Sequence, residues 1–117
     1  MALLTRDQIL QAQDLKTQDI EVPEWGGTVR ISMMTGRSRD LYEAGLFKNK
    51  DSEANYDNLR ARYLSYCLVN EKGDLIFTMQ DVVELGKKSG VAIDRVFEAA
   101  NQLNGTSNEG MEELAKN

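Results

Sequence analysis

The sequence predicts an α+β fold, mainly α, built as a small helical bundle with an N-terminal β-hairpin. Apolar and polar residues alternate with a period of two on both sides of a Pro/Gly turn, between residues 19 and 34. From residue 38 onwards, apolar residues recur at the spacing of three and four that is typical of helices. These two patterns, in this order along the chain, define the predicted fold class.

The length of 117 residues fits one domain. We expect a single globular domain over residues 1–104, with the hairpin at about 19–34 and the helical part at about 38–104. Residues 105–117 are polar and follow a helix stop at Asn104-Gly105, so we expect a flexible polar tail there.

The chain begins with a helix signal. Thr5 and Gln8 have the spacing of a capping box, which predicts a short helix over residues 6–13 carrying Ile9 and Leu10. So short a helix is marginal in water, so we expect it to need docking on something else.

The hairpin is predicted from two alternating segments, residues 19–22 and 28–33, joined by the turn at 23–27. In the second segment, Val29, Ile31 and Met33 share one face because strand side chains alternate.

Helices are predicted after the hairpin at residues 38–47, 57–70, 79–88 and 91–104, with a polar loop at 48–55. Ser38 and Thr78 are suitable N-terminal caps for the first and third of these. The apolar triplet 75–77, which follows a turn at 71–74, is expected to be an extended segment against the core.

No residue is assigned a catalytic, cofactor-binding or metal-binding role. Histidine is absent, which removes the commonest general base and the commonest metal ligand. Cys67 lies on an apolar helix stripe and is interpreted as a buried structural thiol. The acidic cluster Glu109, Glu112 and Glu113 lacks calcium-loop spacing and is interpreted as part of the solvated tail. We therefore expect that the protein is not an enzyme and uses no cofactor.

Net charge, hydropathy and cysteine content argue against nucleic-acid binding, a membrane span and secretion. Fourteen Lys and Arg against nineteen Asp and Glu give a net charge of -5, which disfavours nucleic acid as a partner. No apolar run approaches the ~18 residues of a membrane span. The single cysteine and the lack of a signal-peptide pattern favour the cytoplasm.

Trp25, the only tryptophan, is expected at the tip of the hairpin. It either closes the core or serves as an aromatic anchor for a partner, because Trp is enriched at binding hot spots. Met33 and Met34 favour the second interpretation, since flexible thioethers suit adaptable surfaces. Trp25, Met33 and Met34 are therefore the candidate partner-binding residues.

Four blocks of the sequence, in order, carry a family resemblance. They span residues 4–31, 35–44, 60–89 and 92–117, and include the runs VPEWGG, LNG and ELAKN. In this combination, they resemble the tail assembly chaperones of lambda-like long-tailed bacteriophages and prophages, in their short form. The resemblance covers residues 3–117.

The resemblance implies a non-catalytic protein of the host bacterial cytoplasm that is absent from the mature virion. It implies binding to the tape measure protein and help in recruiting the major tail protein; self-association is left open. One alternative is a structural tail or head-completion protein of the virion. A remote alternative is a small DNA-binding regulator, which is disfavoured because Arg95 is the only cation in the helix at 91–104.

The resemblance also generates a prediction about the gene. Members of the family are often made in two lengths, by a programmed frameshift of one nucleotide backwards near the end of the short frame. The residues at 115–117 can be encoded as GCA-AAA-AAC, which contains the slippery heptamer A-AAA-AAC. We predict that this chain is the shorter product, with its polar tail as the linker in the longer one. Other codons at these positions, with no overlapping frame in the -1 register, would leave an ordinary terminus instead.

Overall fold

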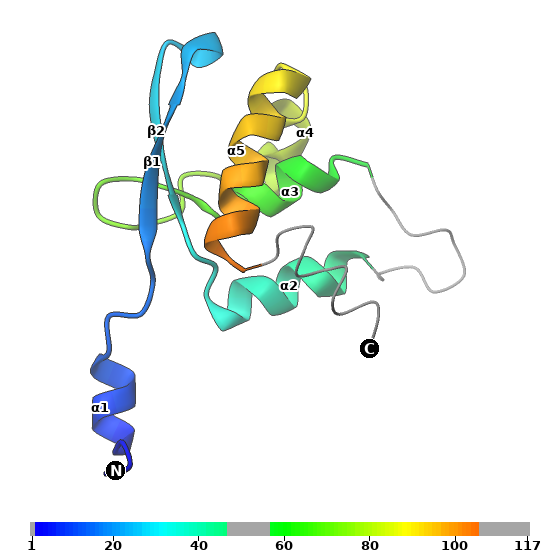
Figure 1. Cartoon of the computed structure of the whole chain (residues 1–117). Coiled ribbons are helices and arrows are strands. Elements are labelled where there is room, and N and C mark those ends of the chain that lie inside the picture. Colours follow the sequence, from blue (N-terminus) through cyan, green and yellow to red (C-terminus); the bar gives the residue numbers. More distant parts are fainter. Residues whose placement is uncertain (1, 47–56, 106–117) are drawn as a thin grey trace, which may run out of the picture.

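The computed structural model describes residues 2–46 and 57–105 (Figure 1). These ranges hold helices, two short 3-10 helices and one sheet, in the order α1 Arg6–Gln11, β1 Thr17–Val22, η1 Pro23–Trp25, β2 Gly27–Ser32, α2 Gly36–Leu46, α3 Leu59–Ser65, β3 Leu68–Val69, η2 Met79–Asp81, α4 Val82–Leu85 and α5 Gly90–Leu103. The fold is α+β and mainly α, which confirms the predicted class.

The sheet has the order β1-β2-β3 and is antiparallel throughout. Strands β1 and β2 form the predicted hairpin, with Thr17 opposite Ser32 and Val22 opposite Gly27. The turn between them contains η1 and ends at Gly26, whose φ of 74° lies in the left-handed region that glycine adopts without strain. The left-handed backbone at the end of this turn therefore explains why the turn signal in the sequence contains glycine.

The helices α3 and α5 pack against each other, and α5 also packs against β1 and β2 (Figure 1). The core lies between them. Its largest fully buried side chains come from the sheet, α3, α5 and the turn after α3: Ile31, Leu64, Leu68, Val22, Val96 and Cys67. Helix α2 joins this core through aromatic rings, since Tyr42 meets Tyr63 edge-on with centroids 5.2 Å apart.

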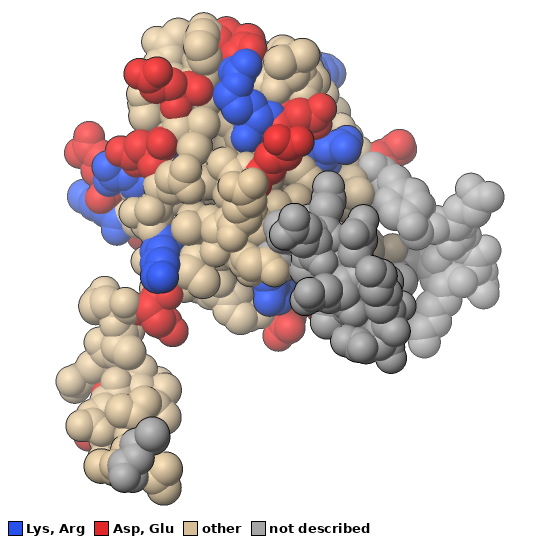
Figure 2. Space-filling model, viewed as in Figure 1, with Lys and Arg blue, Asp and Glu red and all other residues tan. Residues whose placement is uncertain are grey.

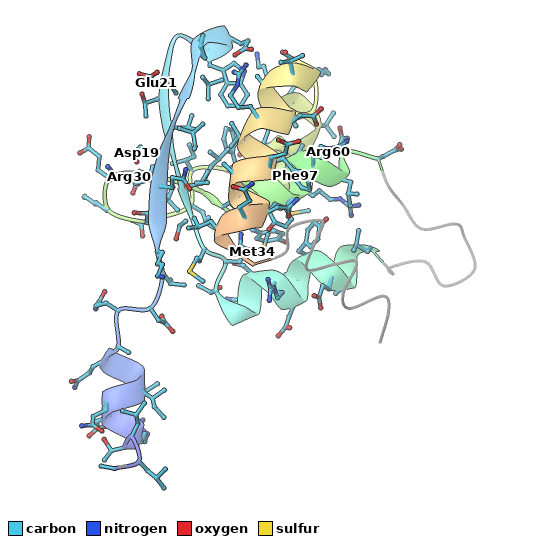
Figure 3. The ribbon with its side chains drawn as sticks, viewed as in Figure 1. Asp19, Glu21, Arg30, Met34, Arg60 and Phe97 are labelled. Carbon is cyan, nitrogen blue, oxygen red and sulfur yellow. The ribbon has the colours of Figure 1, made fainter. Side chains whose placement is uncertain are left out.

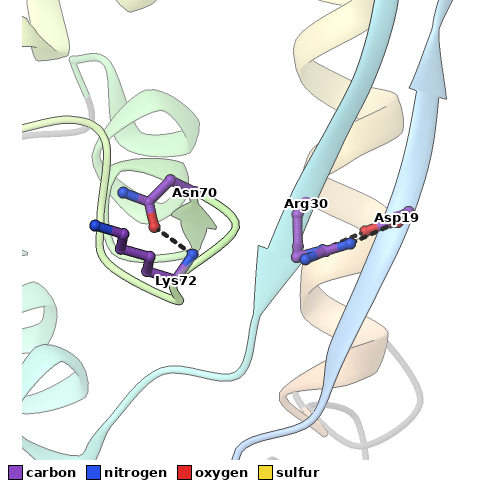
Figure 4. Close-up of polar contacts among 4 residues, drawn as sticks. All are labelled: Asp19, Arg30, Asn70 and Lys72. Carbon is purple, nitrogen blue, oxygen red and sulfur yellow. Dashed lines mark hydrogen bonds and ion pairs between the residues drawn. The ribbon is translucent and has the colours of Figure 1, made fainter.

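The predicted helix over 57–70 is wrong in its second half. Helix α3 ends at Ser65, and Leu68 and Val69 form the third strand of the sheet. The Cys67 carbonyl accepts a hydrogen bond from the Ser32 N–H at 2.8 Å, which draws the chain onto β2. The Asn70 Oδ1 atom then accepts a hydrogen bond from the Lys72 N–H at 2.9 Å (Figure 4). It accepts a second one from the Asp74 N–H. This turn is the one predicted at 71–74.

The predicted helix over 79–88 is also shorter than expected. Thr78 and Asp81 form the expected capping box, but η2 and α4 together end at Leu85. Helix α4 ends where Gly86 packs on Asn58: a Cβ atom on Gly86 would lie 2.0 Å from the Asn58 Oδ1 atom.

The helices predicted at 38–47 and 91–104 are present as α2 and α5. The predicted loop at 48–55 and the tail from 106 lie outside the described residues.

The side chain of Asn104 joins elements that are distant in sequence. Its Oδ1 atom accepts a hydrogen bond of 2.7 Å from the Met34 N–H, just after β2. Its Nδ2 atom donates to the Tyr63 hydroxyl at 3.1 Å and to the Ala100 carbonyl at 2.9 Å. The Asn104 carbonyl accepts from Arg39 Nη2 of α2 at 3.2 Å. We call this set of hydrogen bonds the Asn104 junction; it connects the end of β2, α2, α3 and α5.

We predict that Asn104→Ala lowers the free energy of unfolding by about 2–3 kcal/mol, because it leaves the partly buried Met34 N–H without its acceptor. The exposed neighbour Gln102 is the matched control, and Gln102→Ala is expected to change stability by less than about 0.5 kcal/mol. Urea unfolding of both variants measures the difference. Equal stabilities would show that the Asn104 junction contributes little.

Candidate partner-binding surface

Residues 2–16, which we call the N-terminal arm, extend away from the body of the protein (Figure 1). Helix α1 lies within the arm and has no buried residue. Large apolar side chains are nevertheless concentrated here. The arm carries five of the exposed large apolar residues in the described part of the chain, namely Leu3, Leu4, Ile9, Leu10 and Leu15. Apolar side chains gathered on a protruding element are typical of a binding surface.

The helix in the arm is specified locally. The Thr5 N–H donates to Gln8 Oε1 at 2.9 Å and the Gln8 N–H donates to Thr5 Oγ1 at 3.2 Å, so the predicted capping box is present. Leu4 and Ile9 occupy the positions of a hydrophobic staple. A six-residue helix still falls below the ~12–15 residues at which isolated helices become marginally stable. The capping residues select a helix, while its stability must come from contacts with another surface.

The residue pattern predicts a helix that needs docking, but it assigns none of the side chains of the arm to a binding site. The signal was available, because five Leu and Ile residues precede the first strand. What the sequence did not reveal is that no residue of α1 is buried against the described body.

Trp25, the first of the predicted partner-binding residues, lies at the end of η1 and packs partly buried against the core. Its indole Nε1 atom is buried and has no hydrogen-bond partner among the described residues. This placement matches the interpretation that Trp25 closes the core. A role as a partner anchor stays a prediction.

The two methionines follow β2. Met34 is 9% exposed and belongs to the core cluster, and its N–H donates to Asn104 (Figure 3). Met33 is half-buried, and its N–H donates to the Lys16 carbonyl at 2.9 Å. The structure thus places Trp25 at the hairpin turn and the methionines beyond the opposite end of β2. Their contact with a partner also stays a prediction.

The hairpin turn is held to the body by an ion pair. Arg95 of α5 donates to both carboxylate oxygens of Glu24, with Nη2 at 3.0 Å from Oε2. The hydrogen bonds from Arg95 lower the pKa of Glu24 below its usual value. The DNA-binding alternative requires a basic recognition helix, and Arg95 is the one cation of α5. This cation is already paired with Glu24 of the same chain. This disfavours a recognition role for α5.

Acidic and basic side chains are interspersed on the visible face of the body, whereas the arm shows mostly uncharged atoms (Figure 2). Within residues 2–46 and 57–105, no group of three or more acidic or cysteine side chains is arranged to hold a metal ion. None of the helices in these ranges has the length and apolar character of a transmembrane span. The apolar arm is therefore the most distinctive surface of the described chain.

The described architecture is a β-hairpin sheet packed on α5 and α3, with further helices around them. A comparison with solved structures finds this architecture in the tail assembly chaperone of bacteriophage HK97, with a TM-score of 0.60 and 15% sequence identity. The match covers 83% of this chain and 90% of the HK97 chain. The resemblance identified from the sequence is thereby confirmed at the level of the fold. No protein-family profile matches the sequence, and neither does any curated protein.

Cys67 is fully buried, as expected for a structural thiol. Burial raises its pKa to about 12, and a hydrogen bond from Asn104 Nδ2 offsets part of this effect. Below the unfolded value of about 8.5 the thiol is protonated in both the folded and the unfolded state, so its titration does not change the stability of the fold. As the pH rises from there towards 12, the unfolded state loses the proton first, and the fold loses stability.

We therefore predict that native Cys67 resists alkylation by iodoacetamide at about pH 8, because the thiolate is the reactive form. Labelling followed by intact-mass spectrometry is expected to show modification only after denaturant is added. Rapid labelling of the native protein would contradict the buried placement.

Proposed function

We propose that this protein is a phage tail assembly chaperone that binds the tape measure protein and helps to recruit the major tail protein during tail morphogenesis. In this proposal it acts in the host bacterial cytoplasm and is absent from the mature virion. Two findings support it: the fold shared with the HK97 tail assembly chaperone, and an apolar arm that its own body leaves uncovered. The exposed apolar arm is the observation on which the proposed binding mechanism rests.

The arm suits a long, helical, aggregation-prone partner. Its apolar side chains can pack along the apolar stripe of a partner helix, in the manner of amphipathic helices that recognise each other through residues three and four apart. Burial of Ile9 and Leu10 would contribute roughly 1.5–3 kcal/mol per side chain. Part of that energy offsets the ordering of a helix that is too short to be stable alone.

The opposition between apolar burial and helix ordering would also make binding of the partner reversible. Because ordering the arm costs free energy at the moment of binding, the net affinity stays moderate for the area that is covered. A chaperone that leaves before assembly is complete needs such a balance. A permanent subunit of the particle would gain from an arm that is already packed.

We predict that replacing Ile9 and Leu10 together with Gln reduces capture of the tape measure protein at least ~10-fold, since both apolar contacts are lost. Gln is a good helix former, so the capping box and the helix tendency of α1 are kept. Co-expression with the tape measure protein, followed by pull-down, measures capture.

The matched control is Val83→Gln, because Val83 is 56% exposed and Ile9 57% exposed. It is expected to leave capture unchanged. Equal capture by the arm variant and wild type would overturn the assignment of the arm. Appearance of this protein in purified virions would instead overturn the chaperone role and favour a structural component.

A further inference from the structure

Strand β1 forms one edge of the sheet, because the strand order is β1-β2-β3. The hydrogen-bond pattern shows which of its backbone groups point outwards. The Met33 N–H donates to the Lys16 carbonyl, and the β1–β2 register continues this pairing with Gln18 opposite Ile31 and Ile20 opposite Val29. In an antiparallel ladder, the alternate residues have their N–H and C=O groups on the other side. The outward groups are therefore those of Thr17, Asp19 and Glu21.

The outward N–H groups of these three residues donate no hydrogen bond to any other part of the described chain. An open edge of six residues is a template for pairing with another strand, and proteins usually block such edges with proline, bulges or a covering element. Strand β1 has no proline and no bulge, since its register with β2 is continuous from Thr17 to Val22. The edge is thus geometrically complete as a pairing site.

The side chains of β1 define the chemistry of a matching strand. On the outer face, Asp19 is paired across to Arg30 of β2, with Oδ1 at 2.7 Å from Nε (Figure 4). Glu21 lies on the same face and is exposed to solvent (Figure 3). On the inner face, Ile20 is only half-buried and Val22 is fully buried. A strand added at this edge would place one row of side chains beside the two carboxylates and the other row beside Ile20.

We propose that the open edge of β1 is a strand-addition site for an extended segment of a partner protein in which Lys or Arg alternates with apolar residues. The cations would face Asp19 and Glu21, and the apolar residues would cover the exposed part of Ile20. Strand β2 already shows this alternation on the opposite edge of β1, through Val29, Arg30 and Ile31. The site is distinct from the N-terminal arm and does not depend on the proposed function.

A second copy of β1 is a poor occupant of the same edge. Antiparallel pairing of two such strands through Thr17, Asp19 and Glu21, centred on the middle residue, would set Asp19 opposite Asp19 of the other copy. Like charges directly opposite each other destabilise a strand pair, whereas opposite charges stabilise it. The charges of the edge therefore favour a basic segment over self-pairing.

A fluorescently labelled peptide, acetyl-Thr-Lys-Val-Lys-Val-Lys-Thr-amide, is the probe. We expect it to bind the full chain in an anisotropy titration and to slow hydrogen exchange at the amides of Thr17, Asp19 and Glu21. A peptide with Glu in place of Lys is expected to bind at least ~10-fold more weakly, because each facing charge pair changes sign.

Glu21→Pro removes one outward N–H while sparing the bonds to β2, since proline is tolerated in edge strands where its nitrogen faces solvent. This variant is expected to lose peptide binding. The control Glu21→Gln keeps the backbone donor and is expected to weaken binding only about two- to fivefold. A second test leaves the protein unaltered and uses two N-methylated forms of the peptide. Methylation of the backbone nitrogens that face β1 is expected to abolish binding. Methylation of the alternate nitrogens, which face away from β1, is expected to leave binding intact.

Peptide binding that is insensitive to N-methylation on either edge would overturn the proposal. So would exchange protection of the same three amides that appears with rising protein concentration and no peptide, because that result would identify a second copy as the occupant. Failure of the Lys peptide to bind wild-type protein also overturns it, and leaves the assignment of the N-terminal arm untouched.

Discussion

The carboxamide of Asn104 satisfies backbone and side-chain groups from elements that are up to 70 residues apart in sequence. An amide offers both an acceptor and donors, so one side chain can accept from Met34 and donate to Tyr63 and Ala100 at the same time. In a partly buried setting each of these groups would otherwise cost about 1–3 kcal/mol. These hydrogen bonds fix the C-terminal end of α5 beside α3, α2 and the end of β2, at the border of the apolar core.

Several groups of the body that the sequence offers to a partner or to chemistry are used within the fold. Trp25 and Met34 pack in or against the core, the hairpin turn is held by Glu24 and Arg95, and Cys67 is a protonated buried thiol. The N-terminal part of the chain offers two features to a partner: an apolar arm followed directly by an open strand edge. In the two proposals these features bind different chemistry, so one chain would hold a helical and an extended partner together.

Local signals predicted the fold well where they act within a few residues. The capping boxes at Thr5 and Thr78, the hairpin turn before Gly26 and the helix stop at Asn104 all appear as expected. Prediction failed where long-range contacts decide. Leu68 and Val69 continue the helical spacing of α3, yet pairing with β2 takes them into the sheet, and Gly86 ends α4 against Asn58. The candidate partner-binding residues could not be predicted fully for the same reason. Long-range packing decides which apolar side chains are buried, and only the structure shows that Met34 is enclosed and that Ile9 and Leu10 are not.

In the proposed mechanism, the N-terminal arm is stabilised by a partner and not by its own body. Hydrogen exchange of the chain, alone and with the tape measure protein, measures this stabilisation at each amide. We expect amides of residues 6–11 to exchange at nearly unfolded rates in the free chain while those of α5 are protected, and we expect the complex to protect both. Protection of residues 6–11 in the free chain, or its absence in the complex, would contradict this mechanism.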